Sequence, residues 1–312
     1  MMAVPQRILI TGAAGFVGPH LITQLLRHWP HAILFTERFD ICDAEATRTA
    51  MRAAAPDSCI HLAGITAVGE ARAQPDLAWQ VNLHGTLNLA RAVLAEAPEC
   101  RFLFISSAEA YGGSFRQFGK VAETAALAPM NTYAATKAAA DLAIGAMVAD
   151  GLRAIRLRPF NHTGPGQTEA FVVPAFARQI ARIEAGLQPP VIRTGSLEPS
   201  RDFLDVRDVC AAYALCLAQP ETRLPPGVIL NLASGVPTKI GSVLADLCRI
   251  AGIEVKIETD PSRLRQSDIP LACGNADLAR DLLGWSPAIL WQQTLRDVLD
   301  EWRARIAAGS AI

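Results

Sequence analysis

The amino-acid sequence predicts an α/β fold, a doubly wound parallel sheet with helices on both faces and a smaller C-terminal lobe. Two observations lead to this prediction. Short, uniformly apolar runs alternate with helical patterns, which is typical of parallel strands joined by crossover helices. A glycine-rich turn between Thr11 and Gly18 also separates the first apolar run from the first helical pattern. We find no internal repeat and no low-complexity segment.

The apolar runs are predicted strands because uniformly apolar strands suit a sheet that is covered on both faces. They are Arg7–Thr11, Ala32–Thr36, Ser58–Leu62, Phe102–Ser106 and Arg153–Leu157. Helical patterns fit between them, and Pro30 ends the first of these patterns. The predicted helices are Phe16–Trp29, Ala44–Ala54, Asp76–Ala97 and Thr132–Ala149.

The composition changes after Pro159, where the chain becomes richer in proline and glycine. Between positions 160 and 200 the one clear helical pattern is Val173–Gly186. A helix at Val206–Ala218 and a strand at Val228–Asn231 follow, and we expect the last eighty or so residues to mix short elements. We therefore assign residues 1–160 and 205–233 to a main domain, and residues 161–204 and 234–312 to the smaller lobe.

Composition and charge exclude several classes of protein. Of the 312 residues, 51% are hydrophobic and 19% are charged, which favours a large core over disorder. The formal net charge of -1 and the absence of a basic stripe predict no nucleic-acid partner. Seven cysteines without any C-x-x-C spacing predict a reducing, cytoplasmic location rather than a disulfide framework or a zinc site. The N-terminal apolar run is too short for a signal peptide or a membrane span, so we expect no membrane association.

The glycine-rich turn has the spacing G-x-x-G-x-x-G over Gly12, Gly15 and Gly18. A strand, a glycine turn and a helix in this order form the context of a dinucleotide site, so the main domain is predicted to be of the Rossmann type. Glycines let backbone N–H groups approach a pyrophosphate, and the helix N-terminus adds partial positive charge. The alternative is that these glycines only mark a tight turn. After the second strand, Glu37 suits a ribose hydroxyl and Arg38 a 2′-phosphate, so NADPH and NADH both remain open.

Tyr133 and Lys137 stand four residues apart at the start of a predicted helix, so they lie on one face of it. An ordinary tyrosine has a pKa of about 10 and is a poor proton donor or acceptor at neutral pH. We expect the lysine cation, together with the positive nicotinamide of an oxidised cofactor, to lower the pKa of Tyr133 and make it suitable for acid–base catalysis. A Y-x-x-x-K spacing alone occurs by chance on many amphipathic helices.

Ser107 follows the predicted strand Phe102–Ser106, at the carboxyl end where parallel sheets bind their ligands. Its hydroxyl is suited to hydrogen-bond a substrate oxygen and to hold a carbonyl against Tyr133. The alternative is that Ser107 only caps a turn. The glycine turn, this serine and the Tyr–Lys pair occur in one order along the chain, which favours an active site over coincidence.

Over almost its whole length the chain resembles the extended short-chain dehydrogenase/reductase family. The matching segments are residues 11–18, Asp40-Ile41, His61–Gly64, Val81-Asn82, Ser106–Gly112, the Tyr133 and Lys137 pair, and Arg158–Asn161. The resemblance implies that Asp40 and Ile41 contact adenine and that Lys137 also contacts the nicotinamide ribose. We interpret Asn82 as a helix-positioning or proton-relay residue, and His61 and His162 as structural residues rather than metal ligands. The implied cofactor-binding residues are Gly12, Gly15, Phe16, Val17, Arg38, Asp40, Ile41, Leu62, Ala63, Gly64, Asn82, Tyr133, Lys137 and Arg158.

Within that family, four segments are similar to reductases of GDP-4-keto-6-deoxy-D-mannose: residues 158–167, 200–208, 260–268 and 284–287. The resemblance implies reduction of the C4 ketone with NADPH or NADH to GDP-D-rhamnose or its C4 epimer. It also implies that Asn161, Arg201 and Arg265 hold the diphosphate and ribose, and arginines suit phosphate oxygens. The predicted substrate-binding residues are Ser107, Glu109, Asn161, Arg178, Arg201 and Arg265, and the predicted catalytic residues are Ser107, Tyr133, Lys137 and Glu109.

Other functions remain open. Glu109 aligns with the acid that GDP-mannose 4,6-dehydratases use at C5, so a dehydratase or another epimerase/dehydratase acting on a nucleotide sugar is the alternative. The Thr-Gly-Pro-Gly run at residues 163–166, where those dehydratases have Glu-Ser-Pro-Arg-Arg-Gly, favours the reductase. A dinucleotide-binding sensor without activity is the non-enzyme alternative, but such proteins typically lack the Tyr–Lys pair.

The resemblance also implies a homodimer in which helices near Leu83–Ala97 and Tyr133–Ala149 pair across a two-fold axis. Apolar residues recur along both helices, as a buried helix face requires. They are Leu87, Ala90, Val93 and Leu94 on the first helix, and Ala139, Leu142, Ala143 and Met147 on the second.

Overall fold

Six parallel strands form the central sheet of the protein. The computed structural model describes residues 5–264 and 269–309, and within them these strands take the order β2-β1-β3-β4-β5-β9. They are β1 (Arg7–Thr11), β2 (Ile33–Phe35), β3 (Ser58–His61), β4 (Arg101–Ile105), β5 (Ala154–Pro159) and β9 (Ile229–Leu232). The chain goes from β1 to β2 on one side and then crosses to β3 on the other, so the predicted doubly wound topology is confirmed.

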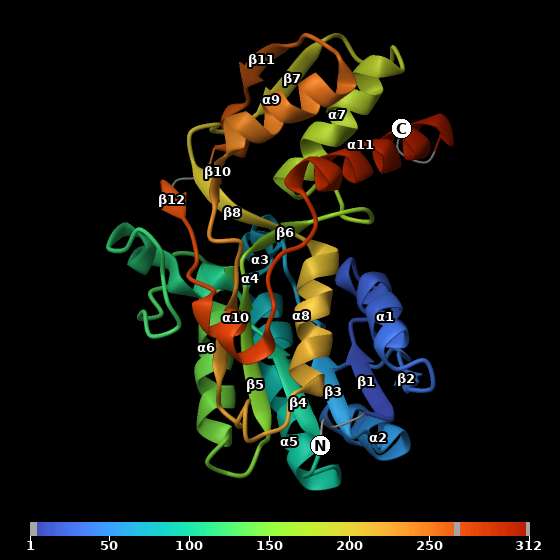
Figure 1. The fold of residues 1–312 in the computed structure, drawn as a ribbon, viewed down its shortest axis with the longest axis vertical. Coiled ribbons are helices and arrows are strands. Elements are labelled where there is room, and N and C mark those ends of the chain that lie inside the picture. The colour runs from blue at the N-terminus through green and yellow to red at the C-terminus, as the bar shows by residue number, and fades with distance from the viewer. Residues whose placement is uncertain (1–4, 265–268, 310–312) are drawn as a thin grey trace.

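Helices cover both faces of this sheet (Figure 1). Successive residues of β1 enter two different cores. Ile8 and Ile10 pack with α1 (Val17–His28) and α8 (Val206–Ala218), whereas Leu9 packs with α2 (Ala44–Ala54) and α5 (Thr86–Glu96). This alternation follows from the two-residue period of a strand. The helices around the sheet are α1 (Val17–His28), α2 (Ala44–Ala54), α3 (Val68–Ala73), α4 (Pro75–Trp79), α5 (Thr86–Glu96), α6 (Thr132–Met147) and α8 (Val206–Ala218), with the 3₁₀ segment η2 (Ala108–Arg116) after β4.

The helix predicted over Asp76–Ala97 is present from Pro75 to Glu96, but it contains an unpredicted π-helical turn, η1 (Gln80–Gly85), between α4 and α5. The Asn82 side chain at this turn points into the structure, where it bonds the backbone of Ile65 through both its oxygen (2.8 Å) and its nitrogen (3.0 Å). It also donates to the Thr136 hydroxyl on α6, at 3.0 Å. The wide turn therefore anchors the loop after β3, and π turns are frequent near functional sites.

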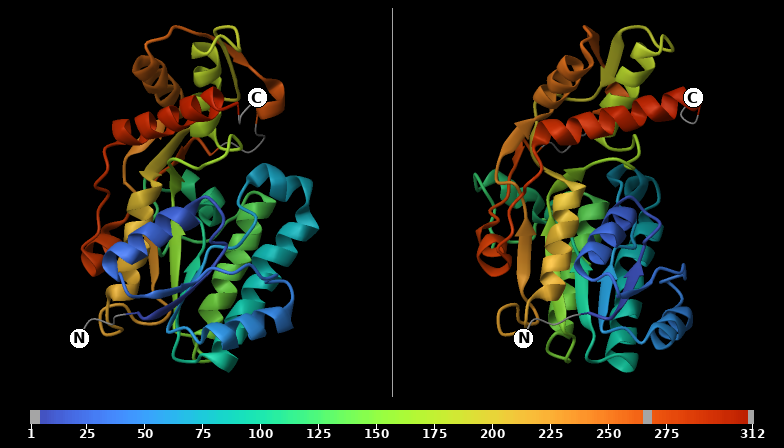
Figure 2. Two further views of the ribbon diagram at one scale, coloured as in Figure 1. Left: turned by 90° about the vertical axis from the view of Figure 1, so that its right-hand side faces the viewer. Right: turned by 45° about the vertical axis from the view of Figure 1, so that its right-hand side comes forward.

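The lobe lies beyond the carboxyl ends of the sheet strands (Figures 1 and 2). Its strands are β6 (Asn161–Thr163), β8 (Ser200–Asp205), β10 (Pro237–Lys239) and β12 (Leu271–Ala272) around β8, with β7 (Val191–Thr194) and β11 (Lys256–Thr259) as a separate pair. Its helices are α7 (Val172–Glu184), α9 (Ile240–Ala251) and α11 (Trp291–Ala307), with the 3₁₀ turn η3 (Pro261–Arg263). These three helices share one apolar core, which includes Phe176, Leu244 and Trp302.

The expectation of short elements over the last eighty residues is wrong, because α9 and α11 have 12 and 17 residues. Buried residues of α11 recur at helical spacing, at Leu295, Val298, Leu299 and Trp302, so the apolar face was present in the sequence. The short helix α10 (Asp277–Leu283) returns from the lobe and packs against α8 and β9. The division into residues 1–160 with 205–233 and 161–204 with 234–312 stays a prediction.

No helix in the described ranges combines the length and the apolar composition that a membrane span requires. The seven cysteines all lie within those ranges and are free thiols.

Candidate functional site

The carboxyl edge of the sheet and the lobe enclose a cavity of about 1320 Å³. Residues that follow β1, β2, β3 and β4 line it on the sheet side. Residues of α7, β8 and η3 line it on the lobe side. Ligands of open parallel sheets bind at this edge, where the strand order reverses, so the cavity is the candidate active site.

The glycine turn forms one end of this cavity and fits the phosphates of a dinucleotide. Gly12 has a φ of +70°, and a Cβ atom there would lie 2.6 Å from the backbone nitrogen of Ala63. Gly12 and Gly15 are exposed, so their backbone faces the cavity. The helix α1 starts with neither a side-chain cap nor an acidic residue in its first turn, so the partial positive charge of its N-terminus suits an anion.

The predicted adenosine contacts divide into two groups. Arg38, Ile41 and the run Leu62–Gly64 line the cavity, as do Phe16 and Val17. Asp40 does not line it; its carboxylate accepts the backbone N–H of Cys42 at 2.8 Å. Asn82 is buried behind the cavity, in the position of a helix-positioning residue rather than of a cofactor contact.

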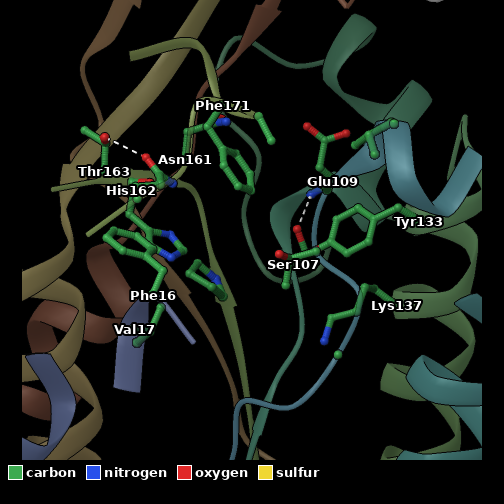
Figure 3. A pocket seen from close by; sticks show the side chains of 18 of the residues that line it. Phe16, Val17, Ser107, Glu109, Tyr133, Lys137, Asn161, His162, Thr163 and Phe171 are labelled. Atoms are coloured by element: carbon green, nitrogen blue, oxygen red, sulfur yellow. Dashed lines mark hydrogen bonds between the residues drawn. The ribbon is translucent and has the colours of Figure 1, made fainter. Parts of the chain in front are cut away.

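The structure brings Ser107, Tyr133 and Lys137 together on one wall of the cavity (Figure 3). Ser107 follows β4 and also caps η2, because its hydroxyl accepts the N–H of Glu109 at 3.1 Å. Tyr133 lies in the first turn of α6, which Asn131 caps by accepting the N–H of Ala134 at 2.8 Å. The predicted serine, tyrosine and lysine therefore lie side by side, although Ser107 follows β4 and the other two residues are on α6.

Burial controls the proton equilibria of this wall. It raises the pKa of Tyr133 to about 12; the neighbouring Ser107 hydroxyl lowers this pKa and the Glu109 charge raises it. Burial also lowers the pKa of Lys137 to about 8, against the opposing effect of Asp141. The Lys137 ammonium donates a hydrogen bond to the carbonyl of Ile105. Lys137 alone therefore does not lower the pKa of Tyr133, and the phenol is protonated at neutral pH. The lowering expected from Lys137 together with the positive nicotinamide of an oxidised cofactor stays a prediction.

Arg158 is a second correction. Its guanidinium does not line the cavity but lies in the core, where Nε and Nη2 each donate to the Asp141 carboxylate at 2.9 Å. Nη1 donates to the Tyr111 hydroxyl at 3.0 Å. A buried carboxylate requires such a partner, which explains why this arginine turns away from the cavity.

The predicted substrate contacts are also divided. Glu109, Asn161 and Arg201 line the cavity, and the Arg201 guanidinium donates to the carbonyl groups of Ser200 (2.9 Å) and Ile269 (2.8 Å). Arg178, on α7, is not among the lining residues. Arg265 lies outside the described residues.

Arg263 and His162 are among the lining residues that were not predicted from the sequence as ligand contacts. Arg263, in η3, has a half-exposed guanidinium that is 3.3 Å from the Asp260 carboxylate. Its position in the segment 260–268, which resembles the reductases, could have indicated a role in substrate binding. His162 also lines the cavity and stacks on Phe16, whereas we had interpreted it as structural. His61, in contrast, is structural as predicted: its ring nitrogens bond the hydroxyl groups of Thr11 (2.7 Å) and Thr86 (2.9 Å).

The doubly wound sheet, the glycine turn and the Ser–Tyr–Lys wall define a dinucleotide-dependent enzyme of the extended short-chain dehydrogenase type. Residues 8–233 match the NAD dependent epimerase/dehydratase family, and the chain belongs to that family. The predicted family is therefore confirmed, and with it the dependence on a nicotinamide dinucleotide.

Relatives in this family act on nucleotide sugars. The chain is 39% identical over 304 residues to the GDP-6-deoxy-D-mannose reductase of Pseudomonas aeruginosa, covering 96% of this chain and 98% of that protein. It is 27% identical over 288 residues to the GDP-6-deoxy-D-talose 4-dehydrogenase of Aggregatibacter actinomycetemcomitans, covering 89% and 91%.

Solved structures agree with the fold. RMD from Pseudomonas aeruginosa complexed with NADPH is similar with a TM-score of 0.86 and 36% identity, over 96% of this chain and 100% of that one. The UDP-glucose 4-epimerase of Thermus thermophilus in complex with NAD is similar with a TM-score of 0.82 and 28% identity, over 96% and 99%.

Proposed function

We propose that the protein reduces the C4 ketone of GDP-4-keto-6-deoxy-D-mannose with NADPH or NADH, forming GDP-D-rhamnose or its C4 epimer. The observation that carries this proposal is the cavity wall on which the Tyr133 phenol lies beside Ser107 and Lys137. A carbonyl reduction consumes one proton, and this phenol is placed to supply it. Similarity to the Pseudomonas aeruginosa reductase over nearly the whole chain supports the choice of sugar.

The side chains of the wall have separate tasks in this reaction. The Ser107 hydroxyl donates a hydrogen bond to the ketone oxygen and holds it against Tyr133. Tyr133 gives its proton to that oxygen as the alcohol forms, and the Lys137 ammonium stabilises the phenolate that remains. The reduced dinucleotide, when bound at the glycine turn, supplies the hydride for C4.

Cationic side chains at the lobe end suit the diphosphate of the substrate. Arg201 and Arg263 both line this end of the cavity, on β8 and η3. Guanidinium groups bind phosphate oxygens through paired N–H donors, and Asn161 adds a neutral amide nearby. We extend the proposal to Arg265, which follows η3 in the sequence.

The direct test is turnover. The protein is incubated with GDP-4-keto-6-deoxy-D-mannose and either NADPH or NADH, consumption of the reduced dinucleotide is followed by absorbance, and the sugar is identified by NMR. We expect stoichiometric oxidation of the dinucleotide and a 6-deoxyhexose with a C4 hydroxyl. The NMR couplings assign the C4 configuration, and a ketosugar recovered unchanged with both dinucleotides contradicts the proposal.

A second candidate function, the 4,6-dehydration of GDP-mannose, is supported by Glu109. Its carboxylate lines the cavity near Tyr133, and Oε2 is 3.5 Å from the Asn131 amide nitrogen. A dehydratase uses such a carboxylate to remove the C5 proton and regains its hydride within one turnover. Glu109→Gln separates the two functions, because a ketone reduction requires no base at C5.

For a reductase we expect Glu109→Gln to leave ketone reduction within about tenfold of wild type. For a dehydratase, conversion of GDP-mannose should fall by about 10²- to 10⁴-fold, the range for a lost acid–base residue. Both reactions are measured on both proteins by NMR. Rapid conversion of GDP-mannose without added reductant, lost in the Gln variant, would make dehydration the function.

We also propose a cytoplasmic homodimer. Leu142 on α6 supports the dimer, because it is 61% exposed on the helix face predicted to pair. Ala90 and Val93 are a correction to the predicted interface, since both are fully buried in the core of the same chain. The free thiols of the chain suit a reducing compartment.

A further inference from the structure

Phe16 and His162 form the wall of the cavity that faces Ser107 and Tyr133 (Figure 3). Phe16 follows Gly15 in the glycine turn and is the N-cap residue of α1, and His162 is the middle residue of β6. Their rings are stacked, with centroids 6.2 Å apart and planes inclined by 11°. His20 makes an edge contact with Phe16, and the centroids of their rings are 5.7 Å apart.

The hydrogen bond of His162 identifies which ring nitrogen carries the proton. Nδ1 lies 2.9 Å from the carbonyl oxygen of Phe160, and only a protonated nitrogen donates to a carbonyl. Burial lowers the pKa of His162, against opposing effects of the Phe160 carbonyl and Asp205, so the ring is neutral near pH 7. Nε2 is therefore an acceptor, and within the described residues it has no hydrogen-bond partner.

A bound nicotinamide would occupy the space along this wall. The hydride must reach a carbon whose oxygen contacts Tyr133, and the diphosphate of the cofactor belongs at the glycine turn. The nicotinamide ring would therefore lie between Gly12 and Tyr133. This placement rests on the dinucleotide site of the proposed function. Its carboxamide carries two N–H donors, the complement of a bare imidazole nitrogen.

We propose that His162 is a positioning residue for the cofactor, and that its Nε2 accepts a hydrogen bond from the carboxamide of the nicotinamide. Phe16 and the Phe160 carbonyl hold the imidazole in the orientation that this bond requires. The bond fixes the rotation of the pyridine ring, and thereby the ring face that is turned toward the sugar. The ligand class that this residue selects is a pyridine with a 3-carboxamide group.

Two substitutions and one cofactor analogue test this role by binding alone. His162→Asn retains an amide that reaches the Phe160 carbonyl but places no acceptor at the position of Nε2. His162→Gln places an amide oxygen near that position instead. The analogue is the 3-acetylpyridine form of the dinucleotide, which lacks the amide donor. The acetylpyridine analogue of NADP⁺ is compared with NADP⁺, and the acetylpyridine analogue of NAD⁺ is compared with NAD⁺. Isothermal titration calorimetry gives Kd for each pair.

We expect wild type to bind the nicotinamide form about fivefold more tightly than the acetylpyridine form, as for one hydrogen bond between neutral groups. This ratio should fall to about one in His162→Asn and return in His162→Gln. A purely structural histidine would change both Kd values together and leave their ratio unchanged, which would overturn the proposal.

Thermal unfolding of the variants serves as the control for folding. If His162→Asn does not fold, His162→Phe takes its place, because a phenyl ring preserves the stack on Phe16 and also lacks the acceptor. A wild-type chain that binds neither dinucleotide would overturn the proposed function as a whole. A chain that binds NADP⁺ or NAD⁺ with the same ratio in wild type and variants would overturn only the role of His162.

Discussion

The protein environment of Tyr133 favours its neutral phenol, which is the form that donates a proton. Its hydroxyl is buried, so the neutral phenol is favoured, and the nearby Glu109 charge acts in the same direction. A group that must donate a proton begins the reaction in the correct state when its pKa lies above the working pH. Lys137, whose pKa is lowered to about 8, remains largely charged at pH 7 and can stabilise the phenolate that forms.

We expect Tyr133→Phe to reduce ketone turnover by at least about a hundredfold, because the general acid is removed. The affinity for NADPH or NADH should change little, since the phenyl ring keeps its packing in the first turn of α6. Steady-state kinetics and fluorescence titration of the reduced dinucleotide measure the two quantities. Turnover within threefold of wild type would remove Tyr133 from the mechanism.

Helix α6 connects the catalytic wall to the core of the sheet. Asn131 caps its N-terminus, and Tyr133, Lys137 and Asp141 follow at spacings that keep them on one face. Asp141 is fully buried and pairs with Arg156 (3.1 Å) and Arg158 (2.9 Å) of β5. The helix is therefore fixed at the end that carries the tyrosine and again one turn beyond the lysine.

We expect Asn131→Ala to lower the free energy of unfolding by about 1 kcal/mol, because α6 loses its side-chain cap. Asn131→Ser should retain most of this stability, since serine is also a good N-cap residue. Urea unfolding of the two variants and wild type, with bound dinucleotide absent, gives the difference. Equal midpoints for the Ala and Ser variants would show that the bond to Ala134 contributes nothing to stability.

At the scale of the molecule, a polar cluster ties the lobe to the sheet. Asp205 ends β8 and caps α8, and its Oδ2 also accepts the Thr294 hydroxyl of α11 at 2.7 Å. Arg207, in the first turn of α8, pairs with both Asp205 (2.7 Å) and Asp297 of α11 (2.6 Å). The starts of α8 and α11 are thereby joined next to the cavity, which fixes the lobe above the carboxyl ends of the strands.

The proposed dimer gives a prediction at the same scale. We expect wild type to be a dimer at micromolar concentration, and Leu142→Glu to be a folded monomer, because a charge cannot be buried unpaired in an apolar interface. Leu187→Glu is the matched control: this leucine is 49% exposed on the lobe, away from α6. Multi-angle light scattering measures the mass of each protein, and a monomeric wild type contradicts the dimer.

Short-range sequence patterns were sufficient to predict much of the fold and the candidate catalytic side chains. The uniformly apolar runs, the helical patterns and the four-residue Tyr–Lys spacing are local features of the sequence, and β1, α2 and α8 have the predicted bounds. The same patterns missed the π turn at Gln80–Gly85, because the bonds that stabilise it join Asn82 to Ile65 and to Thr136, which are remote in sequence.

The sequence by itself determined the class of enzyme, since the order and spacing of Gly12, Ser107, Tyr133 and Lys137 carry that information. Only the tertiary structure decided which arginines face the cavity and how the pKa values of the catalytic side chains are shifted. Arg158 pairs with Asp141 in the core and Arg201 lines the cavity, although both stand in segments (158–167 and 200–208) that resemble the same reductases. Burial and charge are sums over neighbours from many elements, and for that reason the pKa of Tyr133 rises where the isolated Tyr–Lys motif predicts a fall.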